Sequence, residues 1–342
     1  MTFQIRLADL DSADDLRATA DLSATIDLEV YGAVQRRAPQ QQRGFMASTA
    51  YWDVRHHVAV DERSGALIGV GAVHLPLAEN TDNLDFGIGV HPDWRGRGIG
   101  TALADRCAQD ARDAGRTKIT WWAFCPLTGD PDSMSVPANR IARRLGLERR
   151  NISILRRLDL PVAPELLAEI TAEAAPYVEA SGCRLVVWRG PIPDEYVDRY
   201  GPLLTQLELD EPDEDMDLEV QQFDAQRLQV LADRNAARGI ESITAVVVAP
   251  DGSLAGNSEL RYSTTPGTTL VEQESTLVMP AWRGHRFGLA MKAATHTMLA
   301  DVLPEARACV TWNSHVNDQM IAINNRLGYR ALLREIGYQT AT

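Results

Sequence analysis

The chain has 342 residues, of which 45% are hydrophobic and 24% are charged. This composition is typical of a globular protein and excludes wholesale disorder and low-complexity architecture. The length of the chain predicts two domains. No run approaches the roughly 18 apolar residues that a membrane-spanning helix needs. The acidic, amphipathic start of the sequence does not resemble a secretory signal, so we expect a cytoplasmic protein without a membrane partner.

Charge and metal-ligating residues narrow the partners further. The net charge is −13, and a negative surface repels a phosphate backbone, so we expect no nucleic-acid partner. The four cysteines are far apart and form no CxxC pair. His56 and His57 are neighbours that point to opposite faces of a strand. The sequence therefore predicts no metal site, and it does not indicate an oligomeric state.

Apolar periodicity and turn residues predict the elements of the first half of the chain. In chain order they are strand 3–8, helix 13–22, a hairpin of strands 57–61 and 66–75, strand 84–90, helix 100–113, strand 118–124, helix 138–145 and strand 149–158.

A proline-containing stretch, 161–182, predicts a linker with one short helix at 165–174. The second half then follows the same order of elements. They are strand 184–188, helices 196–208 and 223–238, a hairpin of strands 243–249 and 254–262, strand 270–278, helix 288–300, strand 308–313, helix 317–326 and strand 330–337. The acidic run 210–219 is predicted to be a solvated loop.

The sequence itself also repeats. VHPDWRGRGIG at 90–100 recurs as VMPAWRGHRFG at 278–288, and three shorter matches keep the same order at offsets of about 182 to 191 residues. The short matches are GALIG with GSLAG, ITWW with VTWN, and RLGL with RLGY. We therefore predict two copies of one α/β domain, 1–160 and 183–342, joined by the linker 161–182. Each copy is expected to be a mixed, mostly antiparallel sheet flanked by helices.

The best-preserved part of the repeat joins a strand to a helix. Gly96, Gly98 and Gly100 leave the backbone bare, so consecutive N–H groups can converge at a helix N-terminus. Unpaired amides and the helix dipole favour an anion there, and Arg95 and Arg97 add positive charge. The pattern predicts a diphosphate-binding loop, whereas P-loop and dinucleotide-binding fingerprints fit poorly.

Strand, loop and helix together resemble the acetyl-CoA signature of the GNAT acetyltransferase superfamily, Arg/Gln-x-x-Gly-x-Gly/Ala. The resemblance covers nearly the whole chain twice and implies acetyl-CoA as acyl donor. It implies that the end of the strand pairs with the pantetheine arm and that the loop amides bind the pyrophosphate. The donor-binding residues implied in the first copy are Ile88, Gly89, Val90, Arg95, Gly96, Arg97, Gly98, Ile99, Gly100 and Thr101.

The second copy departs from the motif at Arg286, which replaces the first motif glycine. Its side chain either crowds the diphosphate or binds it through the guanidinium, and the sequence leaves both open. The helix after Asn317 resembles the family helix whose Asn contacts CoA, but the family's frequent general-acid tyrosine falls on Asn324 here and on Ala142 in the first copy. The residues implied in the second copy are Thr276, Val278, Arg283, Gly284, His285, Arg286, Gly288 and Asn317.

Acetyl transfer also needs a base or water chain that takes a proton from the acceptor ammonium. Glu274 is the candidate base of the second copy, because strand alternation places it on the same face as Thr276 and Val278. Asp85 is the weaker candidate in the first copy. Its parity places it opposite Val90, unless a bulge lies at 87–89.

These features favour an acetyl-CoA-dependent N-acetyltransferase. We expect a primary amine of an unidentified small molecule to attack the thioester directly. The tandem layout is similar to actinobacterial two-domain acetyltransferases, and one alternative is acetylation of a cysteinyl amine, as in mycothiol synthase. A second alternative is a non-catalytic CoA-binding or scaffolding protein, which the missing tyrosine favours. We expect the tighter CoA site in the first copy and leave open which copy is catalytic.

Overall fold

The computed structural model describes residues 2–211 and 214–340, which form two compact units. Unit 1 comprises the described residues of Met1–Leu155, Asp213–Glu219 and Leu332–Thr342; unit 2 comprises those of Arg156–Pro212 and Val220–Ala331. The boundaries 1–160, 161–182 and 183–342 stay a prediction. The two units differ from them by assigning the end of the chain and a short internal segment to unit 1.

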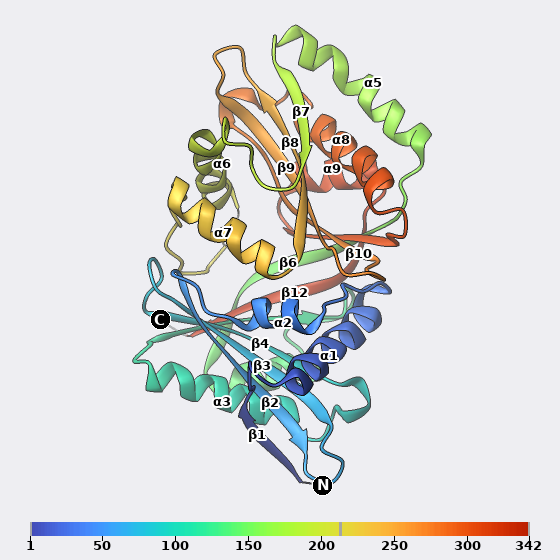
Figure 1. Cartoon of the computed structure of the whole chain (residues 1–342). Helices are drawn as coiled ribbons and strands as arrows, with labels where there is room; N and C mark the ends of the chain where they lie inside the picture. The colour runs from blue at the N-terminus through green and yellow to red at the C-terminus, as the bar shows by residue number, and fades with distance from the viewer. Residues whose placement is uncertain (1, 212–213, 341–342) are drawn as a thin grey trace. The chain divides into compact units, whose positions relative to one another are not determined.

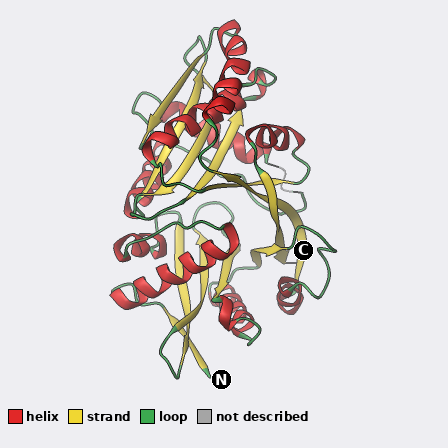
Figure 2. Cartoon of the chain, turned by 90° about the vertical axis from the view of Figure 1, so that its right-hand side faces the viewer, coloured by secondary structure: helices red, strands yellow, loops and turns green. Residues whose placement is uncertain are grey.

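Unit 1 is a mixed sheet with helices on both faces (Figures 1 and 2). Its elements are β1 (Phe3–Leu7), α1 (Ala13–Tyr31), α2 (Pro39–Met46), β2 (Trp52–Asp61), β3 (Leu67–Pro76), β4 (Asn83–Val90), a 3-10 turn (Pro92–Trp94), α3 (Ile99–Asp113), β5 (Lys118–Cys125), α4 (Pro137–Leu145), and most of β6 (Leu147–Asp159) and β12 (Arg330–Thr340). The strand order is β1-β2-β3-β4-β5-β12-β6. The pairs from β1 to β4 are antiparallel, whereas β4 and β5 are parallel.

Glycines let the helices of unit 1 approach its sheet closely. A Cβ added at Gly89 would lie 2.8 Å from Cδ1 of Ile26 on α1. A Cβ added at Gly69 would lie 3.0 Å from side-chain carbons of Ile99 and Leu103 on α3. Gly69 pairs with Val90, one position along β4 from Gly89, so α1 and α3 cover opposite faces.

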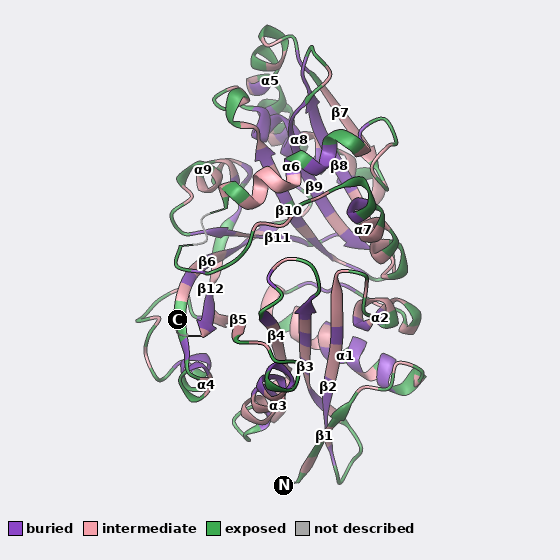
Figure 3. Cartoon of the chain, turned by 90° about the vertical axis from the view of Figure 1, so that its left-hand side faces the viewer, coloured by how far each residue is buried: buried purple, intermediate pink, exposed green. Residues whose placement is uncertain are grey.

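Unit 2 repeats this layout, with one additional helix. Its elements are the end of β6, α5 (Pro164–Ala180), β7 (Arg184–Arg189), α6 (Val197–Asp210), α7 (Ala225–Ala237), β8 (Ile240–Val248), β9 (Leu254–Ser263), β10 (Leu270–Val278), a 3-10 turn (Pro280–Trp282), α8 (Phe287–Val302), β11 (Ala308–Ser314) and α9 (Asp318–Leu327). The strand order is β6-β11-β10-β9-β8-β7, with β10 and β11 parallel. The central strands β8 and β9 are largely buried (Figure 3).

The last strand of the chain completes the sheet of unit 1. Arg334 to Gln339 of β12 pair antiparallel with Cys125 to Thr120 of β5. Strand β6 follows the motif RLGL in the first repeat, and β12 follows the matching motif RLGY in the second repeat. The neighbour of β5 is nevertheless β12, the strand of the second repeat. The final strands of the two repeats have therefore exchanged neighbours.

The described part of the acidic run is fixed within unit 1 from Asp215 onward. The Asp217 amide donates to Oε1 of Gln339 at 2.9 Å, its carboxylate accepts from Nζ of Lys118 at 2.7 Å, and the Glu219 amide donates to Oδ1 of Asn80 at 2.7 Å. The expectation of a solvated loop is confirmed for this segment, because its described residues from Glu211 to Glu219 form no helix or strand and are exposed except Met216. Side chains far away in sequence nevertheless satisfy several of its backbone groups. Residues 212 and 213 of the run lie outside the described residues.

Helix lengths differ most from expectation. α1 extends from the expected 13–22 to Tyr31 and ends at Gly32, whose φ is 66°. α2 was not expected, and the short helix of the linker is the 17-residue α5, which packs with α8. No helix formed by the described residues is long and apolar enough to cross a membrane. In the same part of the chain, no three His, Cys, Asp or Glu side chains group as metal ligands do.

Candidate functional site

The loop between β4 and α3 has the backbone that its glycines predict. Gly96 and Gly98 have φ of 73° and 85°, and an added Cβ at either would meet no atom within 4 Å. Gly98 is the N-cap of α3 and no side chain caps this helix. The first amides of α3 are therefore left for another acceptor, and an anion suits them because the helix dipole adds to their positive potential.

The two arginines of this loop make contacts within unit 1. Nε of Arg95 donates to the Val90 carbonyl at 3.1 Å, and both terminal nitrogens contact the Glu29 carboxylate at 2.7 and 2.5 Å. Arg97 donates to the Asp93 carbonyl at 3.0 Å and lies over the Trp94 ring. Arg95 thus ties the loop to the end of β4 and to α1, while the glycine amides remain as the anion-binding groups.

Strands β4 and β5 separate just before this loop. Their pairing joins Asn83–Phe86 to Lys118–Trp121 and stops there among the described residues, although β4 continues to Val90 and β5 to Cys125. Ile88, Gly89 and Val90, expected to contact the donor, lie on the diverging part of β4. Backbone groups on a diverging strand can pair with an extended amide-containing ligand as an added strand would.

Unit 2 has the same separation and the same loop path. The parallel pairing of β10 with β11 covers only Leu270–Glu272, and β10 continues to Val278. Arg283 repeats the contacts of Arg95: Nε donates to the Val278 carbonyl at 3.3 Å and the guanidinium pairs with Asp210 on α6. Gly284 has a φ of 84°. His285 contacts the carbonyls of Trp282 and Arg283 through Nδ1 at 3.1 Å.

Arg286 takes the left-handed conformation of the glycine it replaces. Its φ and ψ are 55° and 17°, compared with 85° and −5° at Gly98, and both residues are helix N-caps. The guanidinium pairs with Glu173 on α5 and lies 5.1 Å from the centre of the Tyr177 ring. The side chain is therefore held against α5. This arrangement differs from both alternatives that the sequence left open, in which the side chain crowds the diphosphate or binds it.

A cavity of about 250 Å³ opens where β10 and β11 separate. It brings together six of the predicted residues of the second copy, which come from β10, the loop, α8 and α9. They are Glu274, Thr276, Val278, Arg283, Gly288 and Asn317. Asn317 is the N-cap of α9 and its Oδ1 accepts from the Met320 amide at 3.1 Å. The cavity is not lined by Gly284, His285 or Arg286.

A β-bulge in β10 changes the side-chain pattern on which Glu274 was placed. Between Gln273 and Thr276 the strand advances three residues while β9 advances two. Glu274 contacts Arg261 at 3.4 Å, whereas Thr276 contacts Ser258 at 2.9 Å, and these β9 residues have opposite parity. The expected shared face of Glu274 and Thr276 is therefore interrupted. Glu274 still lines the cavity, next to the guanidinium of Arg261.

Asp85 lies on a strand without a bulge. The β3–β4 pairing is continuous from Asp85 to Val90, so Asp85 shares its face with Gly87 and Gly89 and not with Val90. Burial raises the pKa of Asp85 to about 6, opposed by a 3.0 Å hydrogen bond from Asn83. The bulge that would place Asp85 on the face of Val90 is not found in this pairing, and the role of Asp85 as the base of unit 1 stays a prediction.

Sequence reasoning missed Lys292, a fully buried residue of α8 that lines the cavity of unit 2. Its Nζ donates to Oδ1 of Asn324 at 3.0 Å. The available signal was its place in an otherwise apolar helix stretch, four residues after Gly288, in a chain with only one other lysine, Lys118.

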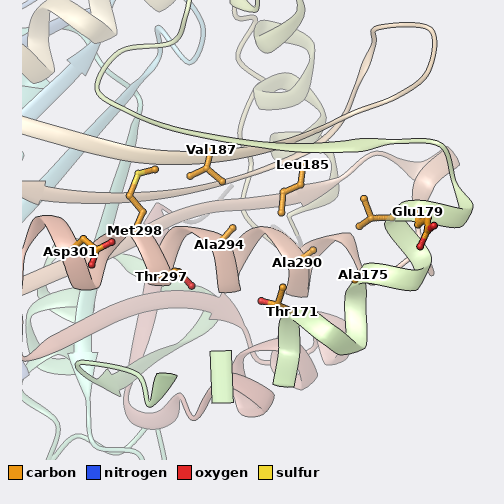
Figure 4. A pocket seen from close by; sticks show the side chains of 11 residues that line it. Thr171, Ala175, Glu179, Leu185, Val187, Ala290, Ala294, Thr297, Met298 and Asp301 are labelled. Carbon is orange, nitrogen blue, oxygen red and sulfur yellow. The ribbon is translucent and has the colours of Figure 1, made fainter. Parts of the chain in front are cut away.

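A larger hollow lies between α5, α8 and β7, with a volume of about 760 Å³ (Figure 4). Its walls are mainly small or apolar side chains, such as Ala175, Leu185 and Ala290. We place the candidate site in the smaller cavity, because a binding site needs converging polar groups that orient its ligand. The smaller cavity has such groups next to Arg283 of the loop, whereas the larger hollow is mainly apolar.

Comparison with known proteins agrees with this geometry. Residues 27–130 match the family model described as "Acetyltransferase (GNAT) family". A search of curated protein sequences gave no match.

Among solved structures, a tandem GNAT protein from the clavulanic acid biosynthesis pathway is 23% identical, covers 99% of this chain and 98% of its own, and has a TM-score of 0.75. A GCN5-related N-acetyltransferase from Sphaerobacter thermophilus is 15% identical over 98% of this chain and 95% of its own, with a TM-score of 0.61. Saccharomyces cerevisiae N-myristoyltransferase with bound myristoyl-CoA and inhibitors is 10% identical over 99% of this chain and 80% of its own, with a TM-score of 0.59. Residues 27–130 are thus an acyltransferase domain of the GNAT family, in a chain that has the fold of a tandem GNAT protein over nearly its whole length.

Proposed function

We propose that this protein transfers an acetyl group from acetyl-CoA to a primary amine of a small molecule in the cytoplasm. The observation that carries the proposal is the same arrangement in both units: two strands separate, and an arginine-anchored loop leads into an uncapped helix N-terminus. This geometry offers backbone groups to a pantetheine arm and amides to a diphosphate. The four cysteines are unpaired and buried, as suits a reducing compartment.

The acceptor proposal rests on the charge of the cavity in unit 2. Asp210, Glu211 and Glu274 line it together with Arg283. Carboxylates attract a cationic amine, and Glu274 is placed to take the proton that the amine loses on attack.

Calorimetric titration with acetyl-CoA tests the donor. The wild-type chain is compared with Gly98→Glu, which adds a carboxylate at the N-cap of α3, and Gly288→Glu, which adds one in the first turn of α8. Gly115→Glu is the matched control for the first variant, because Gly115 also has a positive φ, 66°, and open space around it. Loss of a site in Gly98→Glu alone locates the donor in unit 1, and loss in Gly288→Glu alone locates it in unit 2. Absence of binding to the wild-type chain would overturn the proposal.

A non-catalytic CoA-binding protein is the second candidate function. It is favoured by Asn324 and Ala142, since neither can act as the acid that a tyrosine provides. Thiol release from acetyl-CoA is measured with cadaverine, glucosamine and cysteine amide, the last testing a cysteinyl amine. Turnover with any of these probes argues against the non-catalytic protein, and binding without turnover argues for it.

A further inference from the structure

A buried polar cluster lies behind the cavity of unit 2. Lys292 has no exposed surface, yet it lines the cavity, and its Nζ is held by Oδ1 of Asn324. The amide of Asn324 in turn donates to Oδ1 of Asn313 at 3.3 Å. The side-chain amides thus hold the ammonium behind the cavity, in the interior beside its lining residues.

No carboxylate of the described residues pairs with this ammonium. Its electrostatic neighbour is Cys309 on β11, and its Nζ lies 5.4 Å from the centre of the Tyr329 ring. Tyr329 donates to the Cys309 sulfur at 3.0 Å and also contacts His296, one turn along α8. The titratable or charged groups that face Lys292 from the surrounding elements are Cys309, Tyr329, His296 and, through Cys309, Glu272, while Glu274 lies at the same cavity.

Burial without a counter-ion lowers the pKa of Lys292 to about 8. Thiols of the cysteine type have a pKa of about 8.5. Proton transfer between groups of matched pKa is efficient near neutral pH. An ammonium at this position can therefore both hold a proton and release it.

The positions of unit 1 that are equivalent to this cluster are apolar. Through the repeat, Lys292 corresponds to Ala104, Asn324 to Ala142 and Tyr329 to Leu147, and these three residues belong to an apolar core. At these equivalent positions, polar side chains are therefore found in unit 2, beside its cavity.

We propose that Lys292, positioned by Asn324, donates the proton that the CoA sulfur takes up when the acyl group leaves in the cavity of unit 2. In this step the amine nitrogen bonds to the thioester carbonyl carbon and the C–S bond breaks. The sulfur receives a proton from Nζ, which becomes a neutral amine. The proton lost by the attacking nitrogen passes to Glu274 or water, and Lys292 is reprotonated from solvent. This inference rests on the proposed function.

The chain offers a direct measurement, because it contains only two lysines. Lysine labelled with ¹³C at Cε gives two signals, which Lys118→Arg assigns. We expect the Lys292 signal to titrate near pH 8 and that of Lys118, whose pKa ion pairs raise, to titrate above 10.5. Acetyl-CoA should shift the Lys292 signal and leave the other in place. A Lys292 signal that titrates above pH 10 or ignores acetyl-CoA would overturn the inference.

Kinetics then test the role with three variants and a control. Lys292→Met should lower kcat about 100-fold and change the Kd of acetyl-CoA less than threefold. Lys292→Arg keeps a buried cation that does not release its proton, so kcat should fall similarly. Lys118→Met is the control and should keep kcat within twofold.

Asn324→Asp remains informative if the lysine variants fail to fold. A carboxylate beside Nζ raises the pKa of the lysine, so the alkaline decrease of kcat should move from near pH 8 upward by at least one pH unit. A decrease that does not move, or Lys292→Met with kcat within threefold of wild type, would exclude the proton-donor role. A wild-type chain that neither binds nor turns over acetyl-CoA would instead contradict the proposed function.

Discussion

The two units share a loop geometry but differ in what lies behind it. In unit 1 the loop has glycine at both left-handed positions, and Ala104, Ala142 and Leu147 beside α3 belong to an apolar core, while a buried pair of His57 with Asp110 lies further along the helix. In unit 2 an arginine occupies one left-handed position, and the interior beside α8 holds a lysine, a histidine and amides. The backbone path of the loop is the same in both units, although one loop residue and the interior behind the loop differ. The comparison shows that the loop conformation does not depend on which side chains lie behind it.

The largest expected effect comes from copying the buried lysine into unit 1. Ala104→Lys should lower the free energy of unfolding by about 4 kcal/mol or more, because an unpaired charge would enter an apolar core. Ala104→Met is the control for volume and should cost about 1–3 kcal/mol. Denaturant unfolding of both variants measures the difference. Equal losses would show that size, and not charge, limits this position.

Removing the partner of Lys292 should have the next largest effect. Asn324→Leu leaves the buried ammonium without its 3.0 Å acceptor, so we expect a loss of about 3 kcal/mol in the free energy of unfolding. The double variant Lys292→Met/Asn324→Leu should lose less than the single one, since the charge is gone. Denaturant unfolding of the wild type, the two single variants and the double variant gives the coupling free energy between Lys292 and Asn324. Additive losses would mean that the two residues do not interact.

His296 gives unit 2 a sensitivity to acid that its counterpart Ala108 lacks. Burial, with Lys292 nearby, lowers the pKa of His296 from 6.5 to about 3. The unfolded chain therefore binds a proton below pH 6.5 that the native state does not, and stability is lost as pH falls through this window. Relative to His296→Gln, the wild-type chain should lose about 2 kcal/mol between pH 6.5 and 5. Denaturant unfolding at several pH values measures this, and the same pH dependence of the free energy of unfolding in both chains would refute it.

The smallest effects concern the loops. Gly98→Ala should destabilise by about 1 kcal/mol, since its φ of 85° is unfavourable with a Cβ although no atom is near. Arg286→Gly should change stability by less than about 1 kcal/mol, because relief of the left-handed backbone offsets loss of the half-exposed pair with Glu173. Thermal unfolding compares the two, and a larger loss in Arg286→Gly would show that α5 depends on this pair.

Local pattern was sufficient to predict most elements and both loops. Glycine spacing, strand alternation and helix periodicity depend on neighbours in the chain, so 84–90 and 100–113 lie within a residue of β4 and α3. The bulge at Glu274 and the length of α1 could not be predicted this way, because each depends on packing against other elements. Lys292 was missed for the same reason, since only the fold shows that its helix position faces Asn324 and a cavity.

The residue pattern of the chain was sufficient to predict the duplicated mixed sheet, the order of its elements and the glycine loops that expose helix amides. Three features became visible in the folded chain alone: β12 pairs with β5, Arg286 contacts Glu173 on α5, and Lys292 meets Asn313, Asn324 and Tyr329 in one interior. The physical reason is range: a loop conformation follows from φ and ψ preferences of adjacent residues, whereas strand exchange and buried polar clusters follow from groups more than a hundred residues apart or on different elements.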